Sequence, residues 1–259
     1  MIFFSNISDG RSMKDPLREK CKELLNDEIT YAGLFDLSVT PLPCTDEVRA
    51  KCECDTCGFY NKNWVCPPAV GTVEDCRKII GHYSRFLLFR SEYPIVDWDN
   101  TDDLTECLRM HQENVRRIRT EIKKMLGCDV LPLSGGPCRY CDNCSYPKPC
   151  KHPDKSIPSI ESYGIDVLNL LESKKIKHDK KEGTASYFGM VLFNWSVFNL
   201  FSVLYTVGTR SFNAKSILPS RQTPSFKTQK SHSRRSQSEG LIYYLPFRYC
   251  SMEEVLRQR

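Results

Sequence analysis

Four cysteines fall within thirteen residues of the segment GGPCRYCDNCSYPKPCKHP (135–153) and follow the pattern C-x2-C-x2-C-x5-C. Two residues between cysteines allow one turn of backbone to direct three thiolates toward one metal centre, and a more distant cysteine completes the set. We therefore predict a cofactor-binding site whose ligands are Cys138, Cys141, Cys144 and Cys150.

The spacing leaves two alternatives for the identity of the metal at this site. The spacing is close to the bacterial ferredoxin pattern C-x2-C-x2-C-x3-C-P, which favours an iron–sulfur cluster of the 4Fe-4S type, although x5 departs from it. Zinc usually takes two separated C-x2-C pairs, or one pair with histidines, and His152 could replace a thiolate here. Gly135 and Gly136 would let backbone N–H groups approach the sulfur atoms, or they form a plain turn.

Another cysteine segment, CECDTCGFYNKNWVCPP (52–68), is the first in chain order, so that 135–153 is the second; it contributes Cys52, Cys54, Cys57 and Cys66. These thiols could hold a second centre, or three could bind with one left over, because one residue between two ligands is an awkward spacing. A zinc site with ligands from both segments is a further alternative. We expect Trp64 to be a core aromatic rather than a shield for a cluster. The other cysteines are isolated and expected to be small buried residues, Cys128 being the one closest to a cluster: Cys21, Cys44, Cys76, Cys107, Cys128 and Cys250.

The clearest helix lies between the two cysteine segments. Apolar residues recur at steps of four and three over 104–125, and charged residues fill the other faces. We expect Thr101 or Asp102 to cap its start and Gly127 to end it. His111 lies on the apolar face, where a hydrogen-bonded core histidine is the favoured interpretation over a metal ligand. Three further helices are predicted over 17–25, 73–82 and 159–173.

Four short segments favour strands, because apolar, aromatic or β-branched residues are bounded there by turn residues. Pro132 makes the strand over 129–133 an edge strand or a short one. Alternating strands and helices are compatible with α+β and α/β folds, and we predict α+β: a small mixed sheet packed with three to four helices, with the cysteine segments as long loops at one end. The predicted strands are 31–39, 85–89, 129–133 and 186–193.

Composition bears on the compartment and on partners. Fourteen cysteines in 259 residues indicate either a secreted disulfide framework or an intracellular metal protein. The start, MIFFSNISDGR, does not resemble a signal peptide, and the cysteine spacing suits a shared metal, so we expect a cytoplasmic protein with reduced thiols. The net charge of +5 comes from residues 209–240, which carry +6, so the body has no basic character that would favour nucleic acid.

Residues 185–209 contain no charged side chain over 25 positions, which is the length of a membrane span. Asn194 and Asn199 interrupt the hydrophobicity and the first eight residues resemble a buried strand, so membrane association is the less favoured interpretation. The following residues are polar and basic and are expected to be disordered. We divide the chain into a cysteine-rich metal-binding domain over 1–193 and an atypical extension over 194–259.

Three stretches together resemble a cysteine-rich family of predicted metal-binding proteins of unknown function, widespread in anaerobic bacteria and archaea: 46–80, 135–167 and YFGMVLF at 187–193. The resemblance covers about residues 10–193. It implies that Cys54 is not a ligand and that the metal ligands are Cys52, Cys57, Cys66, Cys138, Cys141, Cys144 and Cys150.

The chain departs from this family in two places. A family stretch that usually reads R-P-S-M-E is IPSIE here (157–161), so Ile157 replaces an arginine and Ile160 a methionine. Family chains ordinarily end soon after the strand at 187–193. Residues 194–259 are therefore foreign to the family, as a fused segment or an altered reading frame would make them.

Three functions follow from these patterns. The first is an iron–sulfur protein that transfers electrons to an unidentified redox partner protein, since the chain has no P-loop, no G-x-G-x-x-G after a strand and no H-E-x-x-H. The second is a zinc-stapled binding or scaffold module. The third is an enzyme that uses the metal centre on an unknown substrate, with Glu161, Tyr163 and Asp166 as polar candidates, although such residues are more often caps and surface groups.

Overall fold

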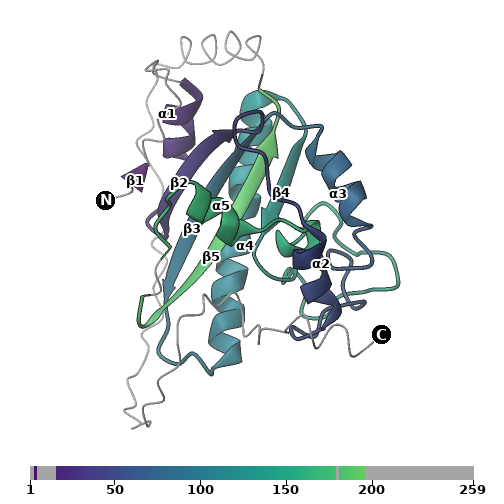
Figure 1. The fold of residues 1–259 in the computed structure, drawn as a ribbon. Coiled ribbons are helices and arrows are strands. Elements are labelled where there is room, and N and C mark those ends of the chain that lie inside the picture. The colour runs from purple at the N-terminus through teal and green to yellow at the C-terminus, as the bar shows by residue number, and fades with distance from the viewer. Residues whose placement is uncertain (1–2, 5–15, 179–180, 196–259) are drawn as a thin grey trace.

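The computed structural model is a five-stranded mixed sheet with helices on both faces (Figure 1). It describes residues 3–4, 16–178 and 181–195. The strand order is β1-β2-β3-β5-β4, with β1 parallel to β2 and the other pairs antiparallel. The predicted α+β class and mixed sheet are therefore confirmed. The strands are β1 Phe3–Phe4, β2 Ile29–Asp36, β3 Arg85–Pro94, β4 Val130–Ser134 and β5 Thr184–Phe193.

The four predicted helices are present, with two corrections. The helix predicted over 159–173 is divided at Gly164, whose φ of 71° interrupts the helical backbone. The long helix is capped by Asn100, which accepts hydrogen bonds from the backbone N–H groups of Asp102 and Asp103, rather than by Thr101 or Asp102. One helix, α2, was not predicted. The helices are α1 Pro16–Glu23, α2 Asp46–Glu53, α3 Val73–Ile80, α4 Thr101–Leu126, the 3-10 turn η1 Glu161–Tyr163 and α5 Val167–Ser173.

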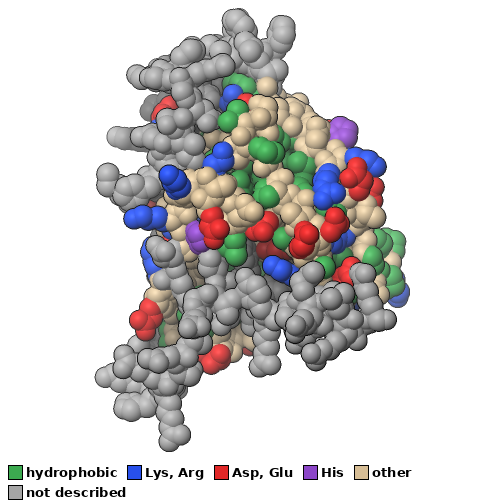
Figure 2. All heavy atoms as spheres, in the orientation of Figure 1, with side chains coloured by type: hydrophobic (Ala, Val, Ile, Leu, Met, Phe, Trp, Pro, Cys, Tyr) green, Lys and Arg blue, Asp and Glu red, His purple; other side chains and the backbone are tan. Residues whose placement is uncertain are grey.

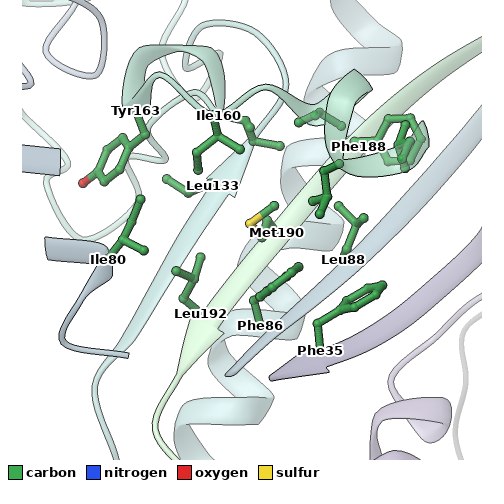
Figure 3. Packing of buried hydrophobic residues seen from close by; sticks show 14 of the residues in the cluster. Phe35, Ile80, Phe86, Leu88, Leu133, Ile160, Tyr163, Phe188, Met190 and Leu192 are labelled. Carbon is green, nitrogen blue, oxygen red and sulfur yellow. The ribbon is translucent and has the colours of Figure 1, made fainter. Parts of the chain in front are cut away.

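Both faces of the sheet are buried along the middle of β3, because neighbouring residues of a strand point to opposite sides and residues 86–89 are all apolar and buried. Phe86 and Leu88 face α3, η1 and α5, in the packing that Figure 3 shows. Leu87 and Phe89 face the long helix α4. In Figure 1, α4 accordingly lies behind the sheet and α5 in front of it. The core thus holds β4, the edge strand that leads into a cysteine segment, through the buried side chain of Leu133.

Two predictions about strands are confirmed. β4, which contains Pro132, is the last strand in the sheet order. β5 runs between β3 and β4, so residues 186–193 form a buried strand. Within the described ranges, no helix has the length and apolar character needed to cross a bilayer. Most of the predicted extension, from residue 196 onward, lies outside the described residues, so the domain division stays a prediction.

The isolated cysteines and His111 mostly take the structural places that the sequence predicts. Cys21, Cys76 and Cys107 are buried, whereas Cys44 and Cys128 are partly buried, and Cys250 lies outside the described residues. Cys128 lies before β4 begins, and its Sγ is 3.5 Å from the carbonyl oxygen of Asn194.

His111 is fully buried in the core. Its ring lies between those of Phe89 and Tyr187, at centroid distances of 5.7 Å to each, and its Nδ1 is 3.1 Å from Ser91 Oγ. It is therefore the hydrogen-bonded core histidine that the sequence favours.

Charged side chains of both signs are intermixed on the face of the molecule drawn in Figure 2. This distribution matches the near-neutral charge that the sequence assigns to the body of the protein.

Candidate metal centre

The second cysteine segment is a loop that leaves the sheet and returns to it at Ser134, the last residue of β4. The backbone N–H of Ser134 donates to Pro158 O at 3.1 Å, and the N–H of Ile160 donates to Ser134 O at 2.9 Å. Gly136, with a φ of 74°, turns the chain away from the strand. Because both ends of the loop are tied to one strand end, the cysteines between them are confined to this edge of the sheet.

The four cysteines of this loop line one pocket. Its empty volume, including the opening to solvent, is about 380 Å³. His152 also lines it, and its ring contacts that of Tyr140 edge-to-face at 5.0 Å. The pocket thus has all four cysteines of the predicted site in its lining: Cys138, Cys141, Cys144 and Cys150.

The first cysteine segment begins in the last turn of α2, which contains Cys52, and continues as turns through Cys57 to Cys66. Buried Arg49 holds α2 in place, since its guanidinium donates to the carbonyl oxygens of Ser162 in η1 and of Gly71. This arginine ties the first segment to the chain that follows the second one.

The two cysteine segments dock against each other through aromatic and amide side chains. Tyr146 Oη donates to Asn61 Oδ1 at 2.8 Å, and Trp64 Nε1 donates to Lys148 O at 2.7 Å. The rings of Trp64 and Tyr146 meet edge-to-face at 5.1 Å. Trp64 also lines the pocket and is only partly buried, so the prediction that it is a core aromatic is wrong. One wall of the pocket is therefore supplied by the first segment.

Electrostatic coupling defines a group of three thiols in the first segment. Burial raises the pKa of Cys52 to about 12, and the Glu161 carboxylate and the Cys57 thiol act in the same direction. Burial also raises the pKa of Cys66, to which Cys57 and Cys52 contribute next. Burial likewise raises the pKa of Cys57. The three thiols therefore lie within electrostatic reach of one another and of one carboxylate.

Cys138 lines the pocket and lies within electrostatic reach of the first group. Burial raises the pKa of Cys141, followed by the thiols of Cys138, Cys150 and Cys144. Cys138 also raises the pKa of Cys66. The seven predicted ligands thus form two adjoining groups, three thiols of the first segment and four of the second.

Two buried polar atoms beside the first group lack hydrogen-bond partners among the described residues. Glu161 Oε2 accepts from Gly136 N at 3.4 Å, whereas Oε1 is buried and unpaired. The Arg139 guanidinium packs over the Phe59 ring at 4.4 Å, and its Nε is also buried and unpaired. An unpaired carboxylate oxygen next to thiols is a donor set that a thiophilic cation would satisfy, because leaving it unpaired costs free energy. In this chemical sense the residues fit a metal.

The side chains are not assembled as a complete ligand set. Within the ranges that the structure describes, no group of three or more His, Cys, Asp or Glu residues is placed so that it could hold a metal ion. The assignment of individual ligands therefore stays a prediction.

Several other residues from the sequence analysis take structural places. Ile157 and Ile160, which replace the arginine and methionine of the family stretch, are fully buried in the core. Tyr163 also lies in the core, and Asp166 caps α5 by accepting from Asn169 N at 3.0 Å. Of the three polar candidates, only Glu161 faces the cysteines.

Two buried amide side chains next to the cysteines were not identified from the sequence. Asn63 Nδ2 lies 3.5 Å from Cys138 O, and Gln112 of α4 contacts the backbone on both sides of Cys138. Gln112 stands four residues after Leu108, within the apolar stripe of the helix. A polar residue in such a stripe is the signal that could have revealed it.

Comparisons with known proteins support metal binding by the cysteine segments. No curated protein and no solved structure matches the chain. One family model, described as "Predicted metal-binding protein (DUF2284)", matches residues 36–193. The match ends at the last residue of β5, where the sequence resemblance ends, and covers both cysteine segments. The chain therefore belongs to this family of predicted metal-binding proteins.

Proposed function

We propose that this protein is an iron–sulfur protein with an electron-transfer or redox accessory role. The observation that carries the proposal is the pocket lined by four thiols, Cys138, Cys141, Cys144 and Cys150, with one wall supplied by the first cysteine segment. Four thiolates around one site are the ligand set of a 4Fe-4S cluster. The family membership supports metal binding in general.

The surrounding residues would adapt the site to such a group. Burial raises the pKa of Cys141, and the charge of Lys151, which lines the pocket, acts in the opposite direction. The lysine charge thus favours the thiolate form that a metal requires. Trp64 lines the pocket on the side of the first segment, where its ring would limit the access of water to a bound cluster. A bound cluster would supply one-electron transfer, and its potential would depend on exposure and on hydrogen bonds to sulfur.

The pocket also supports exchange of electrons with a partner protein. It opens to solvent, and Tyr140 at its rim is about 40% exposed. A redox centre so close to the surface can be approached by a second protein without a conformational change. We propose an unidentified redox partner and a cytoplasmic location, where reduced thiols persist.

A zinc site is the second candidate, and one observation favours it. His152 lines the same pocket as the four cysteines, so a mixed Cys and His ligand set is available. In that case the metal would stabilise the loop, and the function would lie in the surface that it shapes.

The experiment that tests the proposal is analysis of iron, zinc and acid-labile sulfide in protein purified without oxygen, with a visible spectrum. About four irons and four sulfides per cluster, with a broad band that dithionite bleaches, are expected. One zinc without sulfide would replace the iron–sulfur proposal by the zinc module. Protein free of both metals, even after anaerobic reconstitution, would refute metal binding at these cysteines.

A further inference from the structure

The side chain of Gln112 bridges the long helix α4 to the second cysteine segment. It is fully buried. Its Nε2 donates to Pro137 O at 2.8 Å, and its Oε1 accepts from Arg139 N at 2.8 Å. A carbonyl can only accept and a backbone N–H can only donate, so these partners fix the orientation of the amide group.

The two contacts hold the peptide units on either side of Cys138. Pro137 O belongs to the peptide that enters Cys138, and Arg139 N belongs to the peptide that leaves it. Each peptide unit is planar, so the only free rotations at Cys138 are its φ and ψ angles, which join these two peptide planes. Fixing both planes fixes the Cα of Cys138 and the direction in which its side chain leaves the backbone.

The bridge has a rigid base. Leu108 and Val115, which lie four residues before and three residues after Gln112 on α4, are fully buried against the core. The position of Cys138 is therefore fixed by the packed core, through Gln112, and not by its own loop alone. This matters most for Cys138, since it lines the pocket and its backbone carbonyl also contacts Asn63 of the first segment at 3.5 Å.

We propose that Gln112 is a positioning residue for the metal centre: its buried amide sets the place of Cys138 and so the strength with which the centre holds a thiophilic metal. This inference rests on the proposed function. Outer partners that orient metal ligands typically change metal affinity 10- to 100-fold when they are replaced.

The test compares Gln112→Leu with Asn114→Leu. Asn114 is a matched control, because it is a buried amide on the same helix whose side chain bonds to Glu28 and Tyr93, away from the cysteines. The first readout is the rate at which anaerobically purified protein releases iron or zinc to a chelator. The second is hydrogen exchange of the Arg139 amide in metal-free protein.

Gln112→Leu should release metal at least tenfold faster than Asn114→Leu and should exchange the Arg139 amide faster. Equal rates of metal release in the two variants would overturn the inference, even if exchange at Arg139 is faster, because Gln112 would then order the loop without positioning a ligand. A wild-type protein that binds neither metal would overturn the proposed function itself, so the two failures are distinguishable.

Discussion

Acidification should destabilise this protein through His111, which is buried without charge in the core. Burial lowers its pKa from the ordinary value of 6.5 to about 3. Between these values the unfolded chain binds a proton that the folded protein does not bind, so the free energy of unfolding falls as the pH falls. The contribution of His111 to the free energy of unfolding is therefore fully present above pH 6.5 and is lost as the pH falls toward 3.

The magnitude follows from the proton linkage. One proton bound only by the unfolded chain changes the free energy of unfolding by about 1.4 kcal/mol per pH unit. At pH 4.5 the loss due to His111 should be about 3 kcal/mol. The groups that face the ring do not titrate in this range: Ser91 and Phe89 carry no charge, and burial raises the pKa of Tyr187 further above neutrality.

The assay is urea unfolding at several pH values from 7 to 4.5 for the wild type and for His111→Gln. The variant should be less stable at pH 7, but its stability should fall less steeply, so the two curves converge as the pH drops. Other titrating groups contribute equally to both proteins and cancel in the comparison. Parallel curves for the two proteins would refute the reasoning.

Two further predictions concern the backbone and the docking of the cysteine segments. Gly164→Ala should lower the free energy of unfolding in urea more than Gly58→Ala. Both glycines have positive φ, 71° and 75°, so alanine costs about 1–2 kcal/mol of backbone strain at either position. Only at Gly164 would the new methyl group also lie 2.8 Å from Thr45 O. Equal costs would show that this contact does not matter. Trp64→Phe removes the hydrogen bond to Lys148 O, worth about 1 kcal/mol, and should speed amide exchange over 145–150. Unchanged exchange there would mean that the ring alone docks the segments.

The parts of the fold that the sequence predicts are those in which local pattern and packing agree. The long helix shows its apolar stripe, and Gly127 ends it with a φ of 62°. The break at Gly164 is not visible in the pattern, because the apolar residues on both sides of it are buried in one core. Helix α2 was missed because most of its residues are polar, and it is stabilised by the buried contacts of Arg49 with η1 and with Gly71.

In the candidate site too, the features that local spacing predicts differ from those that depend on tertiary packing. Spacing alone groups Cys138, Cys141 and Cys144, since neighbouring ligands share one turn of chain. The docking of Trp64 on Lys148 and the contact of Gln112 with Pro137 join residues distant in the sequence, and no local pattern encodes them. The orphaned oxygen of Glu161 is equally a product of tertiary packing.

The most direct test of the central claim is the metal content of Cys141→Ser compared with Cys128→Ser, both purified without oxygen. Cys141 lines the pocket, whereas Cys128 lies before β4 begins, beyond the far end of that strand. If the four thiols of the second segment hold the metal, Cys141→Ser should lose the iron and sulfide, or the zinc, of that centre, and Cys128→Ser should retain the wild-type amount. Wild-type metal content in Cys141→Ser, or an equal loss in both variants, would contradict the account.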